Sequence, residues 1–230
     1  MVTGNGMVAQ AFANYREDDR FVIFASGVSN SKTTSSPAYE REASLLSATL
    51  QANRNKTIVY FSTCSLYDPD EKNSPYILHK KEMEAVIRNS GLPYYLFRVS
   101  NLVGYSNNLN TILNFFMYHI QKKINFDLWM NATRNLLDIE DMFTIVDTLL
   151  HTKEFINRET NIASPYSYPV KDIVAAVEHF LGIQANYIPV QKGSHFPIDI
   201  SAIQPVIKEK GILSEPDYLA KLLHKYYSNK

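Results

Sequence analysis

The segment from Thr57 to Lys80 reads TIVYFSTCSLYDPDEKNSPYILHK and joins an apolar run to a helix start. Thr57–Phe61 is rich in β-branched and aromatic residues without polar alternation, which is typical of a strand buried on both faces of a parallel sheet. Ser74 followed by Pro75 is typical of an N-cap and a first helical position. The segment therefore predicts a strand, a loop and a helix that runs to about Asn89.

Strands and helices also alternate on both sides of this segment. Phe21–Ala25 and Tyr94–Val99 are apolar runs of the same kind, and Glu40–Asn53 has helical spacing of its apolar residues. The polar stretch Asn30–Pro37 is typical of a surface loop. Repeated strand–helix–strand units are joined by right-handed crossovers, so the sequence predicts an α/β fold with a doubly wound parallel sheet.

The pattern loosens after about residue 100. The later segments with helical spacing are Asn110–Lys122, Ile139–His151, Val170–Leu181 and Glu215–Tyr227. Ser164–Pro169 is typical of a loop. We expect a larger domain over residues 1–160 and a small C-terminal lobe over residues 161–230.

Composition excludes several classes of protein. Lysine plus arginine and aspartate plus glutamate both number 23 in 230 residues, so the chain lacks the positive charge that a nucleic-acid-binding surface needs. One cysteine excludes an internal disulfide framework, and no histidine or cysteine spacing suggests a metal site. No apolar run approaches the roughly 18 residues of a membrane span, and the first residues do not form a secretory signal. We expect a cytoplasmic protein.

Gly4-Asn5-Gly6-Met7-Val8-Ala9 has the pattern G-x-G-x-x-A, and Met7–Tyr15 has helical spacing. Such a loop lets backbone amides approach a pyrophosphate, although glycine pairs also form ordinary turns. Only Met1 and Val2 precede it, so the first strand is short. A dinucleotide fold usually has an acidic residue about 20 positions later, at the end of the second strand. Here Arg16–Arg20 lead directly into Phe21, which leaves no room for two further strands. Either the sheet is shortened, with its second and third strands missing, or the interpretation as a nucleotide-binding loop is wrong.

Tyr76 and Lys80 form the one Y-x-x-x-K match with suitable surroundings; Tyr118/Lys122 and Tyr226/Lys230 are ordinary helix and tail positions. On a helix this spacing places a phenol and an ammonium one turn apart, and the ammonium favours phenolate. The hydroxyls Ser62 and Thr63 follow the predicted strand, and ligands of open α/β sheets bind at such strand ends. The pattern therefore indicates a tyrosine general acid or base.

Several segments together resemble the extended short-chain dehydrogenase/reductases, the NAD-dependent epimerase/dehydratase family that modifies nucleotide sugars. The segments that carry the resemblance, in chain order, are Thr3–Gly6, Val22–Val28, Phe61–Tyr67, Tyr76–Lys80, Arg98–Gly104, Arg134–Asp141 and Thr160–Ala163. The resemblance implies a Rossmann-type fold that is shortened here. The missing acidic residue leaves the choice between NAD and NADP open.

The resemblance also implies roles for individual residues. Thr63, Tyr76 and Lys80 would be catalytic, with Lys80 lowering the pKa of Tyr76. Asn101 and Arg134 would hold the substrate, Arg134 through its phosphate, and Thr63 would contact its carbonyl oxygen. The residues implied to contact the cofactor are Gly4, Asn5, Gly6, Met7, Val8, Ala25, Ser26, Gly27, Tyr76, Lys80 and Val99.

The function implied is an NAD(P)-dependent reductase or epimerase that acts on a nucleotide-activated 4-keto sugar, in surface polysaccharide assembly. The alternative is a non-catalytic NAD(P)-binding or interaction protein on a decayed scaffold of the same family, because two strands are missing. The helices Glu40–Asn53 and Pro75–Asn89 correspond to those that pair in the family's four-helix bundle, so a homodimer is expected. No membrane and no nucleic acid are expected as partners.

Overall fold

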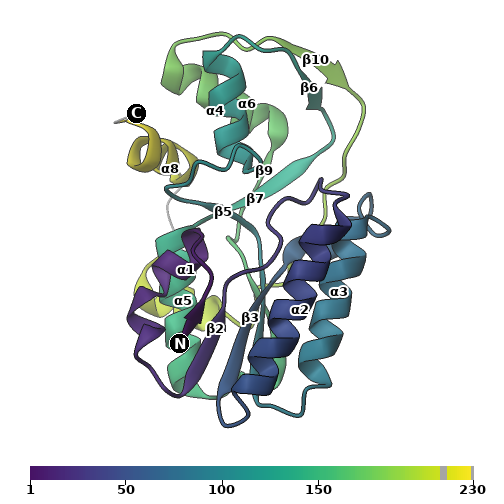
Figure 1. Cartoon of the computed structure of the whole chain (residues 1–230). Coiled ribbons are helices and arrows are strands. Elements are labelled where there is room, and N and C mark those ends of the chain that lie inside the picture. Colours follow the sequence, from purple (N-terminus) through teal and green to yellow (C-terminus); the bar gives the residue numbers. More distant parts are fainter. Residues whose placement is uncertain (213–216, 229–230) are drawn as a thin grey trace.

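The computed structural model describes residues 1–212 and 217–228, and its centre is a parallel β-sheet (Figure 1). The strand order is β1-β2-β3-β4-β8, and every neighbouring pair is parallel. The strands are β1 (Val2–Thr3), β2 (Phe21–Phe24), β3 (Thr57–Thr63), β4 (Tyr94–Val99) and β8 (Arg158–Ile162). The predicted shortened α/β sheet is confirmed: β1 is an edge strand and pairs directly with β2.

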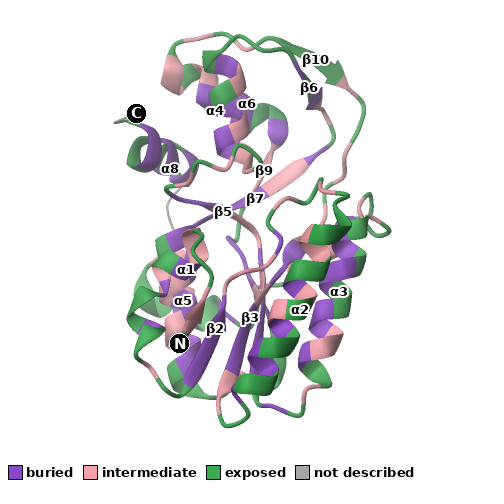
Figure 2. Ribbon diagram, in the orientation of Figure 1, coloured by how far each residue is buried: buried purple, intermediate pink, exposed green. Residues whose placement is uncertain are grey.

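Helices cover both faces of this sheet, which explains the apolar runs without alternation. Val22 packs with Leu46 of α2 (Ser36–Ala52) and Met83 of α3 (Pro75–Arg88). The next residue, Ile23, packs in a second cluster on the opposite face with Ile145. Figure 2 shows the strands buried between the helix layers. The second face is covered by α1 (Met7–Ala11), α5 (Ile139–Thr152) and α7 (Gln204–Lys210).

The start of α3 follows the sequence prediction. The Ser74 hydroxyl accepts a hydrogen bond from the Ile77 amide at 3.3 Å, and Pro75 occupies the first turn. The helix ends at Arg88, and Gly91 adopts a left-handed φ of 72° just beyond it. Both ends of α3 are therefore set by local sequence.

Three predicted boundaries were wrong. Helix α2 begins at Ser36, inside the stretch expected to be loop, because a proline without an amide hydrogen fits the first helical turn. The helix expected over Met7–Tyr15 is divided at Phe12 into α1 and a 3-10 turn, Ala13–Arg16. The expected loop Ser164–Pro169 contains strand β9 (Ser167–Pro169), which pairs antiparallel with β7 (Thr133–Asp138).

A smaller region lies beyond the carboxyl ends of the strands of the main sheet (Figure 1). It contains two small sheets, ordered β5-β7-β9 and β10-β6. The remaining elements here are β5 (Asn101–Val103), α4 (Ile112–Gln121), β6 (Phe126–Trp129), α6 (Val170–Leu181), β10 (Tyr187–Val190) and α8 (Tyr218–Tyr227). The chain enters this region after β4, returns to the main sheet for α5 and β8, and enters the region again with β9 and α6. The predicted division at residue 160 stays a prediction.

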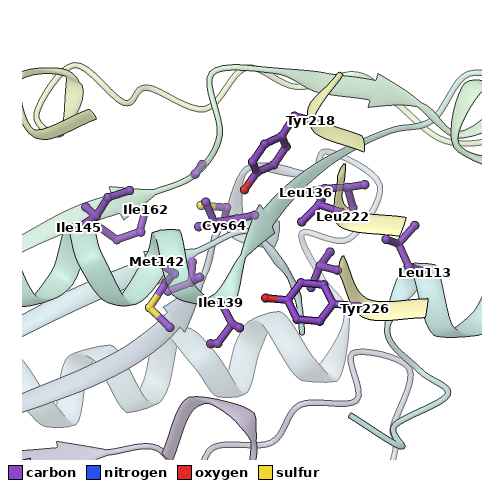
Figure 3. Close-up of a cluster of buried hydrophobic side chains, with 14 of the residues drawn as sticks. Cys64, Leu113, Leu136, Ile139, Met142, Ile145, Ile162, Tyr218, Leu222 and Tyr226 are labelled. Carbon is purple, nitrogen blue, oxygen red and sulfur yellow. The ribbon is translucent and has the colours of Figure 1, made fainter. Parts of the chain in front are cut away.

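Helix α8 is anchored to the end of β7. The Tyr226 hydroxyl and the Lys225 ammonium bind the Asp138 carboxylate, the latter at 2.7 Å. Figure 3 shows Tyr218 and Tyr226 beside Leu136 and Ile139 in a shared apolar cluster. The helix was expected from Glu215, which lies outside the described residues. Within residues 1–212 and 217–228, no helix is long and apolar enough to cross a membrane.

Candidate functional site

A cavity of about 560 Å³ opens where the central strands end. Its wall contains residues that follow β1, β2, β3 and β4, because parallel strands present their carboxyl ends at one edge of a sheet. The predicted site residues that line it are Asn5, Gly6, Met7, Val8, Ala25, Ser26, Gly27, Thr63, Tyr76, Lys80, Val99 and Asn101. The fold therefore brings together segments that are far apart in the sequence.

Two glycines are required by the close packing of this wall. Gly4 has a φ of 121°, and a Cβ there would lie 2.4 Å from the carbonyl oxygen of Ala25. Gly4 itself does not line the cavity, but it brings the first loop against the end of β2. A Cβ at Gly27 would lie 2.7 Å from the Lys80 Nζ atom. Gly4 therefore excludes a side chain, whereas a side chain at Gly27 would displace the Lys80 ammonium.

Tyr76 lies in the first turn of α3, and its side chain is buried against the end of β3. Burial raises the pKa of Tyr76 to about 12, although a hydrogen bond with the Thr63 side chain opposes this. The Thr63 hydroxyl also accepts a hydrogen bond from the Ser65 amide at 3.1 Å. The phenol is therefore protonated at neutral pH and stands next to a second hydroxyl.

Lys80 lies one turn further along α3, and its ammonium is directed to Glu42. Lys80 Nζ donates to Glu42 Oε1 at 3.0 Å and to the Tyr60 hydroxyl at 3.2 Å. The same Nζ lies 5.9 Å from the centroid of the Tyr76 ring. The predicted lowering of the Tyr76 pKa by Lys80 is not found, because burial dominates and a carboxylate neutralises the ammonium.

Glu42 is the first of two residues near the site that sequence reasoning missed. It is 0% exposed and lies on α2 one turn before Leu46, on the face of the helix that packs on the sheet. Burial alone would raise the pKa of Glu42, but Lys80, the Tyr60 hydroxyl and the Val28 amide hold it below its ordinary value. A glutamate on an otherwise apolar helix face was the signal in the sequence.

Asn101 and Arg134 are placed differently. Asn101 lines the cavity, and its Nδ2 donates to the carbonyl oxygen of Asn135 at 3.0 Å. Arg134 does not line this cavity; it donates to the Thr133 carbonyl oxygen at 2.8 Å. Burial lowers the pKa of Arg134, and three carboxylates of the loop before α3 oppose that effect: Asp68, Glu71 and Asp70. The phosphate contact of Arg134 stays a prediction.

Arg41 is a second residue missed from the sequence. It lies on the exposed side of α2 at the cavity wall and donates to the Ser26 carbonyl oxygen at 3.0 Å and to Ser26 Oγ at 3.1 Å. Among the described residues, no carboxylate forms an ion pair with Arg41. It is therefore an unneutralised cation beside the glycine loop, and nothing in its local sequence distinguishes it from a solvated surface arginine.

Cys64 follows Thr63, but its buried thiol is not suited to a catalytic role. Its thiol donates to the Arg98 carbonyl oxygen at 3.0 Å, and burial raises its pKa to about 12. A thiol of such low acidity is a poor nucleophile at neutral pH. This agrees with packing as the role of the residue.

Residues 2–163 match the model of a protein family described as NAD dependent epimerase/dehydratase family. No curated protein sequence matches the chain. The matched segment contains the glycine loop, Thr63, Tyr76 and Lys80, and it covers most of the chain.

Solved structures with similar folds include three nucleotide-binding proteins. The dTDP-glucose 4,6-dehydratase of Bacillus anthracis, in complex with NAD, is 16% identical with a TM-score of 0.71, over 99% of this chain and 79% of that one. The UDP-glucuronic acid 4-epimerase of Bacillus cereus, with UDP-glucuronic acid and NAD, is 17% identical with a TM-score of 0.69, over 95% and 81%. RMD from Pseudomonas aeruginosa, with NADPH, is 14% identical with a TM-score of 0.68, over 94% and 84%.

Proposed function

The chain belongs to the NAD dependent epimerase/dehydratase family, and on that basis we propose that it is an NAD(P)-dependent reductase or epimerase of a nucleotide-activated 4-keto sugar. One observation carries the proposal: Thr63, Tyr76 and Lys80 meet at the wall of a cavity that the glycine loop also lines. A reductase is favoured over an epimerase because reduction needs a single hydride delivery, which suits a shortened domain.

The residues around the cavity fit a dinucleotide. Helix α1 begins at Met7, its N-cap Gly6 makes no side-chain cap hydrogen bond, and Gly6, Met7 and Val8 line the cavity. The backbone amides of this turn would bind phosphate oxygens. Arg41 adds a positive charge beside this loop. The similar structures contain NAD or NADPH, and the same classes of cofactor are proposed here. The bound nicotinamide would supply or accept the hydride.

The chain's own residues would handle the proton. Tyr76 would donate its hydroxyl proton to the substrate carbonyl oxygen, and the Thr63 hydroxyl would stabilise the negative charge that develops there. Asn101, which also lines the cavity, would contact the sugar nucleotide. The substrate class is proposed because the similar epimerase of Bacillus cereus binds UDP-glucuronic acid. The product would then serve surface polysaccharide assembly.

A titration of intrinsic protein fluorescence with NADH and with NADPH tests the proposal. Saturable binding of either dinucleotide supports it, and the tighter ligand identifies the cofactor. Absence of binding by both would contradict it and favour the alternative, a non-catalytic interaction protein, which the missing strands beyond β1 motivate. A screen of nucleotide-activated 4-keto sugars with the bound dinucleotide would then test the reaction itself.

We also propose a homodimer formed through α2 and α3. These helices pack side by side on one face of the sheet (Figure 1). Leu78 of α3 is a large apolar side chain that is 54% exposed. If light scattering at micromolar concentration gave the molar mass of a single chain, that result would contradict the proposed homodimer.

A further inference from the structure

The ammonium of Lys80 is already satisfied by groups other than Tyr76. It donates to Glu42 Oε1 at 3.0 Å and to the Tyr60 hydroxyl at 3.2 Å, and its side chain is 3% exposed. The Tyr60 hydroxyl in turn donates to Glu42 Oε1 at 2.6 Å. The cation that would favour a tyrosinate is therefore paired with a carboxylate behind the cavity wall.

The carboxylate of Glu42 is fixed in place on every side. Its Oε2 accepts from the Val28 amide at 2.6 Å and lies 3.0 Å from His79 Nε2. Gly27, the neighbour of Val28, leaves the space that the ion pair occupies. A buried carboxylate with this many donors stays ionised, so its charge acts continuously on the groups around it.

Tyr76 is within reach of both charges of this pair. The charge of Glu42 opposes loss of the phenol proton, whereas an ammonium such as Lys80, whose Nζ lies 5.9 Å from the ring centroid, favours it. The largest effect on Tyr76 is burial, which acts in the same direction as Glu42 and favours the neutral phenol. The titratable groups that surround Tyr76 are Tyr39 and Glu42 from α2, Tyr60 from β3, and His79 and Lys80 from its own helix.

We propose that Glu42 is a positioning residue that holds the Lys80 ammonium and thereby keeps the Tyr76 hydroxyl protonated for donation to a substrate oxygen. The inference rests on the proposed function and names its direction, which is reduction of a carbonyl. In that reaction a reduced nicotinamide, once bound, would supply the hydride to the carbonyl carbon and would itself be oxidised. The carbonyl oxygen gains the proton of Tyr76, whose O–H bond breaks, and the phenolate regains a proton from solvent.

The test measures ionisation of Tyr76 directly, without cofactor or substrate. The protein is labelled with 3-fluorotyrosine, and the Tyr76 resonance is assigned by its absence in a Tyr76→Phe variant. Its ¹⁹F shift is then followed against pH in the unsubstituted protein and in Glu42→Gln. The label is present in both, so its own effect on acidity cancels. We expect the Tyr76 transition of Glu42→Gln at least about one pH unit lower, because Lys80 then acts unopposed.

Glu84→Gln is the matched control. Glu84 is a buried carboxylate on α3, the helix that carries Tyr76, but it is paired with Arg98. Its loss should therefore move the Tyr76 transition by less than about half a pH unit. The double variant Glu42→Gln/Lys80→Met removes both charges and should return the transition to that of the unsubstituted protein. An unchanged transition in Glu42→Gln, or an equal shift in Glu84→Gln, would overturn the proposal.

A second comparison decides the matter if Glu42→Gln does not fold. Lys80→Met leaves Glu42 alone beside Tyr76, and the double variant lacks both charges, which proteins often tolerate. The double variant should titrate at least about half a pH unit below Lys80→Met. Equal transitions would overturn the proposal. Dinucleotide binding is measured separately, so a failure of the proposed cofactor leaves this result interpretable.

Discussion

Glu42 and Glu84 are two buried carboxylates on neighbouring helices, and each is paired with a cation and a hydroxyl. The Glu42 carboxylate accepts hydrogen bonds from the Lys80 ammonium and from the Tyr60 hydroxyl, and Lys80 lines the cavity. Glu84 receives a two-pronged contact from Arg98, at 3.0 Å and 2.7 Å, and the Ser62 hydroxyl at 2.6 Å.

The two sites differ in how the cation is held and in whether it lines the cavity. The guanidinium of Arg98 is held by both oxygens of Glu84 and also donates to the Tyr67 hydroxyl at 3.0 Å. Arg98 does not line the cavity, so its role is to join α3 to β4. Lys80 is a single point charge at the cavity wall, and a small shift would bring it nearer Tyr76. Similar chemistry therefore stabilises the fold at one carboxylate and tunes a site at the other.

The largest expected effect concerns the structural pair. Arg98→Met leaves Glu84 buried without its main partner, so the free energy of unfolding should fall by about 3 kcal/mol, measured by urea denaturation. The double variant Glu84→Gln/Arg98→Met should recover part of this loss. A loss in Arg98→Met below about 1 kcal/mol, the range of exposed pairs, would remove the contrast.

The second effect concerns the cavity. Tyr76→Phe removes the proton donor and should lower turnover at least about 100-fold, while the dissociation constant of the dinucleotide stays unchanged. Steady-state kinetics and fluorescence titration measure the two quantities. Unchanged turnover would show that the Tyr76 side of the comparison has no catalytic role.

The third effect is the pH dependence of stability. The pKa values of Glu42 and Glu84 in the folded protein are lowered, because nearby cations and hydrogen bonds outweigh burial. Their contribution is therefore fully present above the ordinary glutamate pKa of about 4.3 and is lost as the pH falls through the lowered value. Urea denaturation between pH 6 and pH 3 should show a shallower loss in Glu84→Gln than in the unsubstituted protein. Parallel curves would contradict this.

The smallest expected effect is shared by both carboxylate sites. Ser74→Ala removes the N-cap of α3, which carries Lys80 and Glu84, and should cost about 1 kcal/mol of unfolding free energy. Thermal or urea unfolding measures it, with Ser90→Ala beyond the end of the same helix for comparison. A much larger loss would mean that the helix start, rather than the ion pairs, organises both sites.

The local features of the fold were predictable from the sequence. The apolar runs around Ile23 and Val59 indicated strands buried on both faces, and Ser74 with Pro75 fixed the start of α3. The division of the first helix at Phe12 was not, because packing of that side chain under the sheet decides it. Strand β9 was missed because it becomes a strand only through its pairing with β7, which is distant in the sequence and leaves no local pattern.

By itself the sequence determined the order of β2, α2, β3, α3 and β4, the shortened sheet and the placement of Tyr76 one turn before Lys80, because these depend on periodicity and on contacts between near neighbours. Only the tertiary structure decided that Glu42 would face Lys80 and that Arg41 would border the cavity. Side chains on one helix meet those of another only after both pack on the sheet, and a local pattern carries no record of that meeting. In the proposed reaction, the direction of proton transfer at Tyr76 would therefore depend on a residue that no motif includes.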